Sequence, residues 1–379
     1  MKLTTAGESH GKALVAIIEG LPAHLKVDTE KINGELALRQ SGFGRGARQK
    51  IERDQVEILT GVRNNETLGS PMTLCIYNKD FENWSNCMSS GDCDESVMTA
   101  KSLTKVRPGH ADLTGIIKFQ QTDARNILER ASARETAIRV AAGGVYKGYL
   151  SALGIEIGGY VSEICGVKDG GRYTFNELLR AKTTQTGMLD TQAERLAMDK
   201  IAELKKQGDT AGGAVEIRVK GLKSGFGNVM TYAEKLDARL AQGLMSIQAV
   251  KGVEIGAGFA VASTSGKDIH DEIFYDEKKG FYRESNRAGG IEGGMSNGEE
   301  LVLRVAMKPI PTLMQGLRTV DYATKEQTKA ASERSDVCAI FALEIIAEAV
   351  VAQVLADVIS ERLGGDTMEE VQERYKKLP

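Results

Sequence analysis

The stretch that sets the fold of the N-terminal part of the chain covers residues 3–18 and reads Leu3-Thr4-Thr5-Ala6-Gly7-Glu8-Ser9-His10-Gly11-Lys12-Ala13-Leu14-Val15-Ala16-Ile17-Ile18. Two apolar runs flank a glycine-bounded turn, which predicts two short strands within residues 1–20. The turn carries one of only four histidines in the chain, and its glycines permit a tight backbone and close approach of a ligand. The stretch alone favours a hairpin whose turn happens to hold a histidine. Imidazole is also the usual proton carrier near neutral pH, so His10 is a candidate acid–base group.

Length and composition describe an ordinary folded protein with many glycines. The 379 residues are 41% hydrophobic and 27% charged, enough for one large domain or for two of about 150 residues. The net charge of −3 gives no general attraction to nucleic acid or to an anionic membrane. The five cysteines are scattered and no signal-peptide pattern is visible, so we expect reduced thiols, no metal site and a cytoplasmic protein.

Apolar periodicity predicts a mixed α+β chain. Strands are expected over residues 55–62, 72–77, 155–167, 214–219, 253–261 and 301–307. Helices are expected over residues 28–40, 126–153, 174–182, 189–207, 233–249 and 337–362. The last helix contains Glu344, Glu348 and Asp357, so we expect a buried amphipathic helix and not a membrane span. Residues 78–105 form a polar insertion with the only tryptophan, Trp84, and should be a lid, a subunit contact or a mobile segment.

A short internal similarity suggests duplication. Gly154-Ile155-Glu156-Ile157-Gly158 and Gly252-Val253-Glu254-Ile255-Gly256 each follow a predicted alanine-rich helix. Such matched units are typical of a repeated architecture. No linker rich in proline or serine divides the chain, so we expect one interlocked body.

An arginine-rich loop follows the helix predicted at 28–40. It reads Arg39-Gln40-Ser41-Gly42-Phe43-Gly44-Arg45-Gly46-Ala47-Arg48. Guanidinium forks bind phosphate and carboxylate in a bidentate way, and glycines let these forks and backbone N–H groups converge on an anion. The loop predicts an anion site, with a solvated basic loop or an RNA-binding tract as alternatives. A single short copy in a negatively charged protein disfavours RNA.

Other motifs place charges beside helix ends and turns. Arg130 and Arg134 are four residues apart, so we expect them on one helix face, where they repel unless an anion lies between them. Ser132 to Arg134 lie near the expected helix start, where phosphates bind well. Asp336 is expected to be the N-cap of the C-terminal helix.

Seven motifs, taken in order, resemble the chorismate synthase family. They are Gly7–Gly11, Arg39–Arg48, Arg107–Asp112, Glu129–Gly143, Asn297–Gly298, Lys308–Thr312 and Glu333–Asp336. Together they span almost the whole chain. Two stretches depart from the family pattern: Gln248 stands where the family usually has Asn, and Ile340–Glu344 stands where a Pro-Ala-Ala-Gly run is common.

The resemblance implies a reaction and a fold. The family converts 5-enolpyruvylshikimate-3-phosphate to chorismate by 1,4-anti elimination of phosphate and a ring proton, using reduced FMN without net redox change. The length leaves no obvious insertion for a flavin reductase, so a separate reductase is expected to supply reduced FMN. The implied fold is a single large domain over residues 1–379 with pseudo-duplicated halves, a duplicated β-α-β sandwich with helices inside and sheets outside, assembled as a homotetramer.

The resemblance also implies roles for individual side chains. His10 would protonate the leaving phosphate, His110 would stabilise the reduced flavin near N1, and Asp336 would assist proton transfer near N5. The residues expected to bind FMN are Ser132, Ala133, Arg134, Gln248, Ala249, Gly293, Lys308, Pro309, Ile310, Pro311, Thr312 and Arg334. The residues expected to bind the substrate are Ser9, Arg39, Arg45, Arg48, Arg134 and Arg334.

Three other functions stay open. A flavin-dependent oxidoreductase would use the same site for net hydride transfer and would consume reduced flavin stoichiometrically. A polyanion- or RNA-binding protein would show a steeply salt-dependent affinity. A phosphatase with His10 as nucleophile would release phosphate without forming a conjugated diene.

Overall fold

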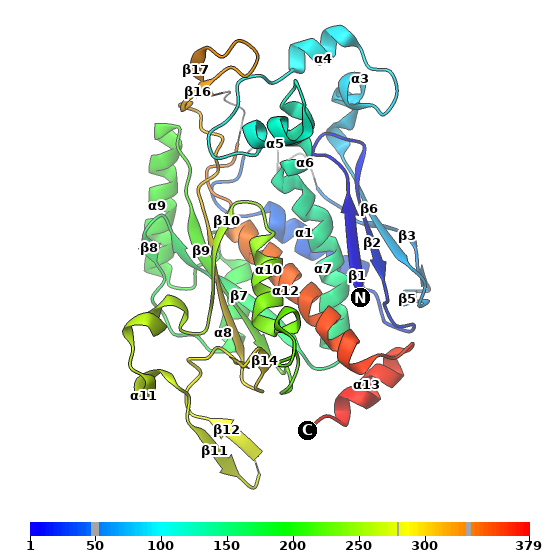
Figure 1. Ribbon diagram of the computed structural model, residues 1–379, viewed down its shortest axis with the longest axis vertical. Coiled ribbons are helices and arrows are strands. Elements are labelled where there is room, and N and C mark those ends of the chain that lie inside the picture. The colour runs from blue at the N-terminus through cyan, green and yellow to red at the C-terminus, as the bar shows by residue number, and fades with distance from the viewer. Residues whose placement is uncertain (47–52, 279, 331–334) are drawn as a thin grey trace.

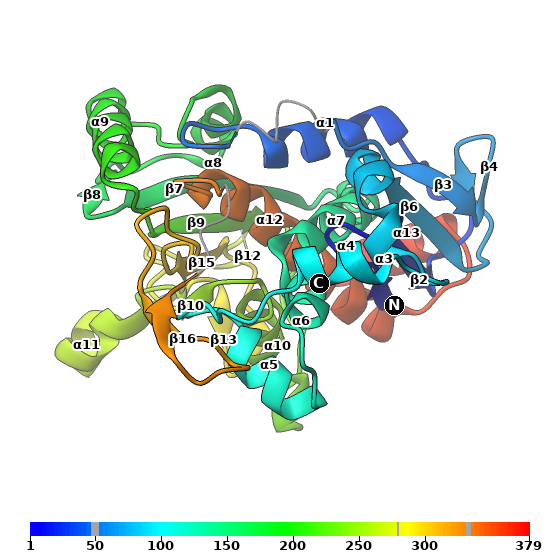
Figure 2. The ribbon, with the colours of Figure 1, turned by 90° about the horizontal axis from the view of Figure 1, so that it is seen from above.

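The computed structural model describes residues 1–46, 53–278, 280–330 and 335–379. Within them, two antiparallel sheets stand on either side of a layer of helices (Figures 1 and 2). The mixed α+β fold expected from the sequence is therefore confirmed. The way in which the chain builds the two sheets decides where its candidate site residues meet.

The first sheet comes from the first 77 residues. Its strands lie in the order β1 (Lys2–Ala6), β2 (Ala13–Glu19), β6 (Met72–Tyr77) and β3 (Glu57–Thr60). The expected hairpin is confirmed, because β1 pairs with β2 in register from Lys2↔Glu19 to Ala6↔Val15. Side chains alternate along β2, so that Leu14, Ala16 and Ile18 are fully buried against the helices.

The second sheet comes from the middle of the chain. Its strands lie in the order β10 (Val250–Ile255), β15 (Leu301–Met307), β9 (Gly213–Lys220), β7 (Glu156–Ile164) and β8 (Val167–Lys168). The central pairing is long: β15 matches β9 from Leu301↔Val219 to Met307↔Gly213. β15 therefore delivers residue 308 to the end of the sheet, where the candidate site begins.

Both sheets share one topology. In each, two strands precede a helix, two strands follow it, and a long helix comes next. With the first sheet these helices are α1 (Thr29–Gln40) and α7 (Thr136–Ser151), and with the second they are α10 (Leu236–Met245) and α12 (Ile340–Leu363). In each sheet the four strands lie side by side in the order first, second, fourth and third, with β8 added at one edge of the second.

The repeated pentapeptide does not relate the two sheets. Gly154–Gly158 leads into β7 and Gly252–Gly256 lies along β10, and both strands belong to the second sheet. In chain order β7 is the first and β10 the third strand of the topology that the two sheets share, so the two pentapeptides do not mark corresponding strands. The two sheets resemble each other in the order of their strands, and a match of five residues does not predict strand order.

The helix layer is built around α7 and α12. α7 contacts β2 and β6 of the first sheet, whereas α12 contacts β7 and β9 of the second, and the two helices pack against each other. They approach closely, because a Cβ on Gly143 would lie 2.3 Å from the Cβ of Ala349. Every residue of α12 from Ile340 to Ala352 is buried, and exposed residues occur only near its end, at Glu361 and Arg362. The expectation of an amphipathic helix is therefore wrong for the part that packs between the sheets. A helix enclosed between two layers has no solvent side.

Several predicted elements have different bounds. The helix expected at 126–153 is broken into α6 (Arg125–Ala131), a 3-10 turn η2 (Ala133–Glu135) and α7, because Ser132 is extended. The strand expected to reach residue 261 ends at Ile255, since Gly256 and Gly258 have positive φ and begin a 3-10 turn, η5 (Gly258–Ser263). The helix expected at 174–182 is α8 (Phe175–Leu178) followed by η3 (Leu179–Thr183), and that at 189–207 is α9 (Thr191–Gln207).

The remaining elements are short and carry little periodic signal. They are β4 (Val62–Arg63), β5 (Glu66–Thr67), η1 (Lys79–Asn83), α3 (Ser85–Met88), α4 (Glu95–Lys101), α5 (Asp112–Phe119), η4 (Tyr232–Glu234), α11 (Gly266–Ile269), β11 (Ile273–Asp276), β12 (Gly280–Arg283), β13 (Ile291–Glu292), β14 (Met295–Ser296), β16 (Arg318–Val320), β17 (Gln327–Lys329) and α13 (Met368–Lys376). The polar insertion thus contains η1, α3 and α4, at one end of the molecule (Figure 1). Throughout the described chain, no helix has both the length and the apolar character needed to cross a bilayer.

Candidate active site

A cavity of about 1280 Å³ opens where the two sheets and the helix layer meet. The turn between β1 and β2, the loop after α1, the junction of α6 and α7, the end of β15 and the start of α12 all contribute to its wall. Of the residues that the sequence singled out, those lining it are Ser9, His10, Arg39, Arg45, His110, Ser132, Ala133, Arg134, Gln248, Ala249, Lys308, Ile310, Pro311, Thr312 and Asp336. Motifs as far apart in the chain as those of Ser9 and Asp336 therefore form one site.

Two predicted site residues in the described part of the chain do not line the cavity. Gly293 does not line the cavity; it lies in the turn between β13 and β14, close to Val229 and Met295. Pro309 is also absent from the lining, although its neighbours on both sides belong to it. Arg48 and Arg334 lie outside the described residues.

His10 is held by a buried carboxylate from another part of the chain. Its Nδ1 lies 3.0 Å from both oxygens of Glu129 in α6, and its backbone N–H donates to the same carboxylate at 2.8 Å. Glu129 is only 2% exposed. Burial by itself raises the pKa of Glu129, but bonds and charge from His10, together with the charge of Arg125, outweigh burial and lower it. The carboxylate is therefore ionised at neutral pH and fixes the orientation of the imidazole.

The turn that carries His10 is locked by glycine and by Asn78. Gly7 has a φ of +113°, and a Cβ there would lie 2.4 Å from the carbonyl oxygen of Ala13. The side-chain amide of Asn78 donates to the carbonyl oxygen of Gly11 at 2.6 Å. These constraints set the position of His10 at the cavity wall.

His110 has a matching arrangement. Its Nδ1 lies 2.5 Å from Oδ1 of Asp112, which is fully buried at the start of α5. Asp112 also accepts from the Nε and Nη2 groups of Arg107, and Arg107 donates in turn to Oγ1 of Thr312. Burial alone raises the pKa of Asp112, but the bonds from His110 and Arg107 lower it well below the ordinary value.

Two buried arginines share one carboxylate. Oδ2 of Asp54 lies 2.5 Å from Nη1 of Arg134 and 3.8 Å from Nη1 of Arg39. Arg134 also donates to Oδ1 of Asn78, and Arg39 donates to Thr136 and to the carbonyl oxygen of Ala133. Burial, followed by the charges of Arg134 and Arg45, lowers the pKa of Arg39 to about 9. Both guanidinium groups are thus held rigidly with an excess of positive charge.

The break between α6 and α7 is what separates Arg130 from Arg134. Arg130 is exposed and contacts Thr5 and the carbonyl oxygen of Gly7, whereas Arg134 points into the cluster around Asp54. The expectation that the two arginines stack on one helix face is wrong. Ser132 is extended and its hydroxyl caps the 3-10 turn by accepting from the N–H of Arg134 at 3.2 Å.

Asp336 does not cap the last helix, contrary to expectation. The N-cap of α12 is Ala339, whose side chain makes no capping bond. Asp336 instead reaches the arginine-rich loop: Oδ1 accepts from the backbone N–H of Gly46 at 2.6 Å, and Oδ2 pairs with Nη1 of Arg45 at 3.0 Å. This contact closes one side of the cavity.

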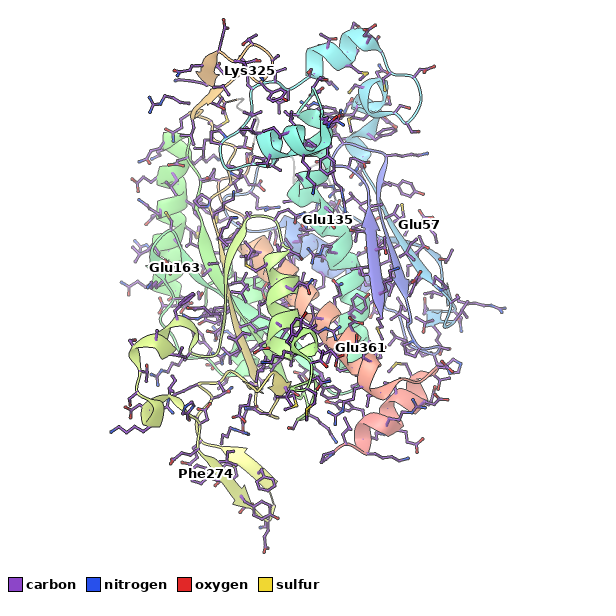
Figure 3. All side chains as sticks on the ribbon, in the orientation of Figure 1. Glu57, Glu135, Glu163, Phe274, Lys325 and Glu361 are labelled. Carbon is purple, nitrogen blue, oxygen red and sulfur yellow. The ribbon has the colours of Figure 1, made fainter. Side chains whose placement is uncertain are left out.

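The opposite side is formed by two turns that pack together. Ala249 adopts a φ of +67°, which is rare for a residue with a side chain, and its carbonyl oxygen accepts from the N–H of Lys308 at 3.0 Å. The ammonium group of Lys308 in turn donates to the carbonyl oxygen of Gly109, beside His110. Gln248 donates to Glu135, which is labelled in the interior of Figure 3 near the start of α7, at 3.3 Å.

The lining is strongly basic. Its cationic residues are Arg39, Arg45, Lys79, Arg107, Arg134, Lys205, Lys251 and Lys308, whereas its acidic residues are Asp80 and Asp336. Two buried polar atoms at the site, Nε of Arg45 and Oε1 of Gln248, have no hydrogen-bond partner among the described residues. Such a wall binds a ligand with several negative charges, and the two histidines can move protons at it.

Sequence reasoning missed several residues that complete the site. Glu129, Asp112, Asp54, Asn78 and Trp84 were not assigned a role, and the first four are buried polar groups bonded to predicted site residues. For Asp112 a signal was available, because it lies two residues after His110 in the same motif. Asp54 and Asn78 lie in no recognisable pattern with the groups they contact. Across the described residues, no group of His, Cys, Asp and Glu is placed to hold a metal ion.

The chain is similar to known proteins over almost its whole length. The family model of chorismate synthase matches residues 1–360. The chain is 51% identical to the chorismate synthase of Geobacter sulfurreducens, covering 99% of this chain and 98% of the relative, and 50% identical to that of Caldicellulosiruptor bescii, covering 100% and 99%. A crystal structure of chorismate synthase superposes with a TM-score of 0.80 at 39% identity, covering 99% of this chain and 96% of that chain.

Proposed function

The chain belongs to the chorismate synthase family, and on this premise we propose how its side chains share the work of the reaction. Its activity is that of a chorismate synthase, a phosphate lyase. The family acts on 5-enolpyruvylshikimate-3-phosphate and uses reduced FMN. The observation that carries the assignment of roles is that two histidines line one basic cavity, each with Nδ1 held by a buried carboxylate.

The cavity fits a substrate and a flavin together. Its volume of about 1280 Å³ exceeds the range of about 300–1,000 Å³ that is usual for one small ligand. The unpartnered Oε1 of Gln248 is an acceptor suited to an N–H group of a flavin ring, so the change from Asn to Gln keeps the chemistry of that position. Reduced FMN, when bound, supplies electron density that helps phosphate leave and recovers it afterwards. Residues proposed to hold it are Ser132, Ala133, Arg134, Gln248, Ala249 and Lys308–Thr312.

His10 is proposed to donate a proton to the leaving phosphate. Phosphate dianion is a poor leaving group, and protonation by a positioned imidazole lowers that barrier. Because Nδ1 is engaged by Glu129, proton exchange with a ligand in the cavity goes through Nε2. The ionised carboxylate of Glu129 also fixes the direction in which Nε2 points.

Arg39, Arg45 and Arg134 are proposed to bind the phosphate and carboxylates of the substrate, with Ser9 beside them. Arg39 and Arg134 are fixed by Asp54, Asn78 and Thr136, so little conformational entropy is lost when an anion binds. Arg48 and Arg334 remain proposed ligands from the family motif alone.

His110 and Asp336 are proposed to face the flavin. Asp112 and Arg107 both hold the ring of His110, since Nδ1 lies 2.5 Å from Oδ1 of Asp112 and 3.0 Å from Nη2 of Arg107. Asp336 is positioned by Arg45 and by the N–H of Gly46, and its carboxylate can accept a proton.

Beyond the site, we propose that reduced FMN comes from a separate reductase and that the protein works in the cytoplasm as a homotetramer. We also propose that residues 1–379 form one domain with pseudo-duplicated halves, a sandwich with its sheets outside. The common strand order of the two sheets and the contacts of α7 and α12 support this.

Anaerobic incubation with enolpyruvylshikimate phosphate and reduced FMN tests the assignment. We expect many turnovers per flavin, with product formation monitored by the absorbance of the conjugated diene. His10→Ala and His110→Ala should each lower the rate about 10–1,000-fold, in line with general acid–base contributions of about 10²–10⁴. Stoichiometric consumption of reduced flavin would favour the oxidoreductase, and phosphate release without diene would favour the phosphatase. Aerobic turnover with NADPH and FMN alone would contradict the separate reductase.

A further inference from the structure

Three contacts restrain the imidazole of His10, and two of them come from Glu129. The backbone N–H and Nδ1 of His10 both bond to its carboxylate. Glu129 is anchored in turn by Arg125, whose Nη1 lies 3.2 Å from Oε1 one helical turn earlier in α6. The backbone is also tied in, because the N–H of Ser9 donates to the carbonyl oxygen of Glu129 at 3.0 Å. The edge of the ring is therefore fixed from α6.

The third contact covers the face of the ring. Trp84 stacks on His10 with ring centroids 4.0 Å apart and an interplanar angle of 28°. Trp84 belongs to the polar insertion at residues 78–105, and its indole N–H donates to Oδ2 of Asp80 at 3.0 Å. Cations pack near the indole as well, with Nζ of Lys101 at 3.8 Å and the guanidinium of Arg125 at 5.1 Å from the ring centroid. The insertion thus supplies part of the cavity wall and touches the proton donor itself.

We propose that Glu129 and Trp84 are positioning residues for His10: Glu129 fixes its tautomer and the orientation of its edge, and Trp84 holds the plane of the ring so that Nε2 is aimed at the leaving phosphate. This inference rests on the proposed role of His10. It also gives the insertion at 78–105 a place in catalysis.

The proton balance of the step follows from these contacts. The Nε2–H bond of the imidazolium breaks and an O–H bond forms on the departing phosphate, leaving His10 neutral with its remaining proton on Nδ1, bonded to Glu129. Solvent returns the proton to Nε2 after the products leave. A carboxylate on Nδ1 fixes which nitrogen gives up the proton.

The first test separates positioning from substrate binding. We expect Glu129→Gln to lower kcat about 10–100-fold, the usual cost of removing a group that orients an active residue, with little change in the KM for the substrate. Trp84→Leu should lower kcat by up to about 100-fold through misplacement of the ring, and Trp84→Phe, which keeps an aromatic face, should recover most of the rate. Glu369→Gln is the matched control, since Glu369 bonds to Nδ1 of the exposed His24 at 3.2 Å.

The second test reads His10 directly. Trp84 is the only tryptophan, and a protonated imidazole stacked on indole quenches its fluorescence. We expect the emission of the wild-type protein to fall as pH is lowered, and to show no such transition in His10→Asn. The charged groups facing the pair are Glu129 and Arg125 of α6, Lys101 of α4 and Asp80 of η1. In Glu129→Gln the transition should differ from that of the wild-type protein, because the carboxylate that faces Nδ1 is gone. Glu369→Gln should keep the wild-type transition.

The outcomes distinguish this inference from the proposed function. If the wild-type protein forms chorismate but Glu129→Gln keeps both the wild-type kcat and the wild-type transition, the role of Glu129 is refuted. An emission transition that persists in His10→Asn, together with full activity of Trp84→Leu, refutes the stacking role. Failure of the wild-type protein to form diene, with the fluorescence transitions as expected, refutes the proposed function and leaves the geometry of the cluster intact.

Discussion

Nδ1 of His110 lies 2.5 Å from Oδ1 of Asp112, a carboxylate with no solvent exposure. The same carboxylate accepts two bonds from the guanidinium of Arg107 and one from the backbone N–H of that residue. The motif Arg107–Asp112 is therefore a small network, tied to the segment that follows β15 by the bond from Arg107 to Thr312. It presents one histidine to the cavity in a fixed orientation.

Removing the charge of Asp112 should impair catalysis through His110. We expect Asp112→Asn to lower kcat about 10–100-fold, as is usual when the partner of an active histidine is lost, and to weaken the affinity for FMN. Single-turnover kinetics and flavin titration would measure the two effects. Asp271→Asn is a suitable control, because Asp271 is equally enclosed but bonds only to residues 285–288. Unchanged kinetics in Asp112→Asn would contradict the network.

The same network predicts how stability depends on pH. The pKa of Asp112 is lower in the folded protein than in the unfolded chain. Its stabilising contribution is therefore complete above the unfolded value of about 3.9 and is lost as pH falls below that value. Urea unfolding at a series of pH values should show the free energy of unfolding falling below pH ~4, less steeply in Asp112→Asn. An equally steep fall in the variant would assign the acid sensitivity to other groups.

Asp54 should be needed for folding unless another anion takes its place. Asp54→Asn leaves Arg39 and Arg134 buried without their shared counter-charge, at a cost of about 3–5 kcal/mol. We expect inorganic phosphate to restore stability to this variant more than to the wild-type protein, because the arginines then bind phosphate instead. The control is Asp169→Asn, a buried carboxylate bonded to backbone N–H groups and Tyr173, which phosphate should not rescue.

Arg45 should matter more for the substrate than for the flavin. It pairs with Asp336, and its Nε has no partner among the described residues. Loss of a charge-assisted hydrogen bond costs about 1.5–3 kcal/mol, so Arg45→Ala should weaken substrate affinity about 10–150-fold with a smaller effect on FMN. Titration calorimetry of each ligand measures this, with the exposed Arg63→Ala as control. An unchanged substrate affinity would remove Arg45 from the anion clamp.

Two neighbouring glutamates of α12 should respond oppositely to substitution. Burial and the charge of Glu348 raise the pKa of Glu344 well above its ordinary value, whereas Lys147 and Lys182, at 2.5 and 2.8 Å, hold Glu348 ionised. Glu344→Gln replaces a neutral acid by a neutral amide and should not reduce stability at neutral pH. Glu348→Gln removes one of the two carboxylates that Lys147 and Lys182 share and leaves them only Glu35, so it should cost about 1.5–3 kcal/mol. Equal urea midpoints for the two variants would contradict this assignment.

Local patterns in the chain were sufficient for several features. The two apolar runs around the glycine turn predicted the first hairpin, and the helix expected over residues 28–40 is confirmed as α1. The ordered motifs identified the family, and most of the residues that they assigned to the site line the cavity. Such features depend on neighbours within a few positions, which are adjacent in space because they are adjacent in the chain.

The partners of those residues depended on the tertiary structure. Glu129 reaches His10 across 119 positions, and Asp336 reaches the N–H of Gly46 across 290. Packing between two sheets accounts for the break at Ser132, which sends Arg130 and Arg134 apart, and for the complete burial of residues 340–352 of α12. The sequence by itself determined which side chains could do chemistry and which family they belong to. Only the folded layers decided which carboxylate holds each histidine, because that choice depends on how distant segments pack and not on spacing along the chain.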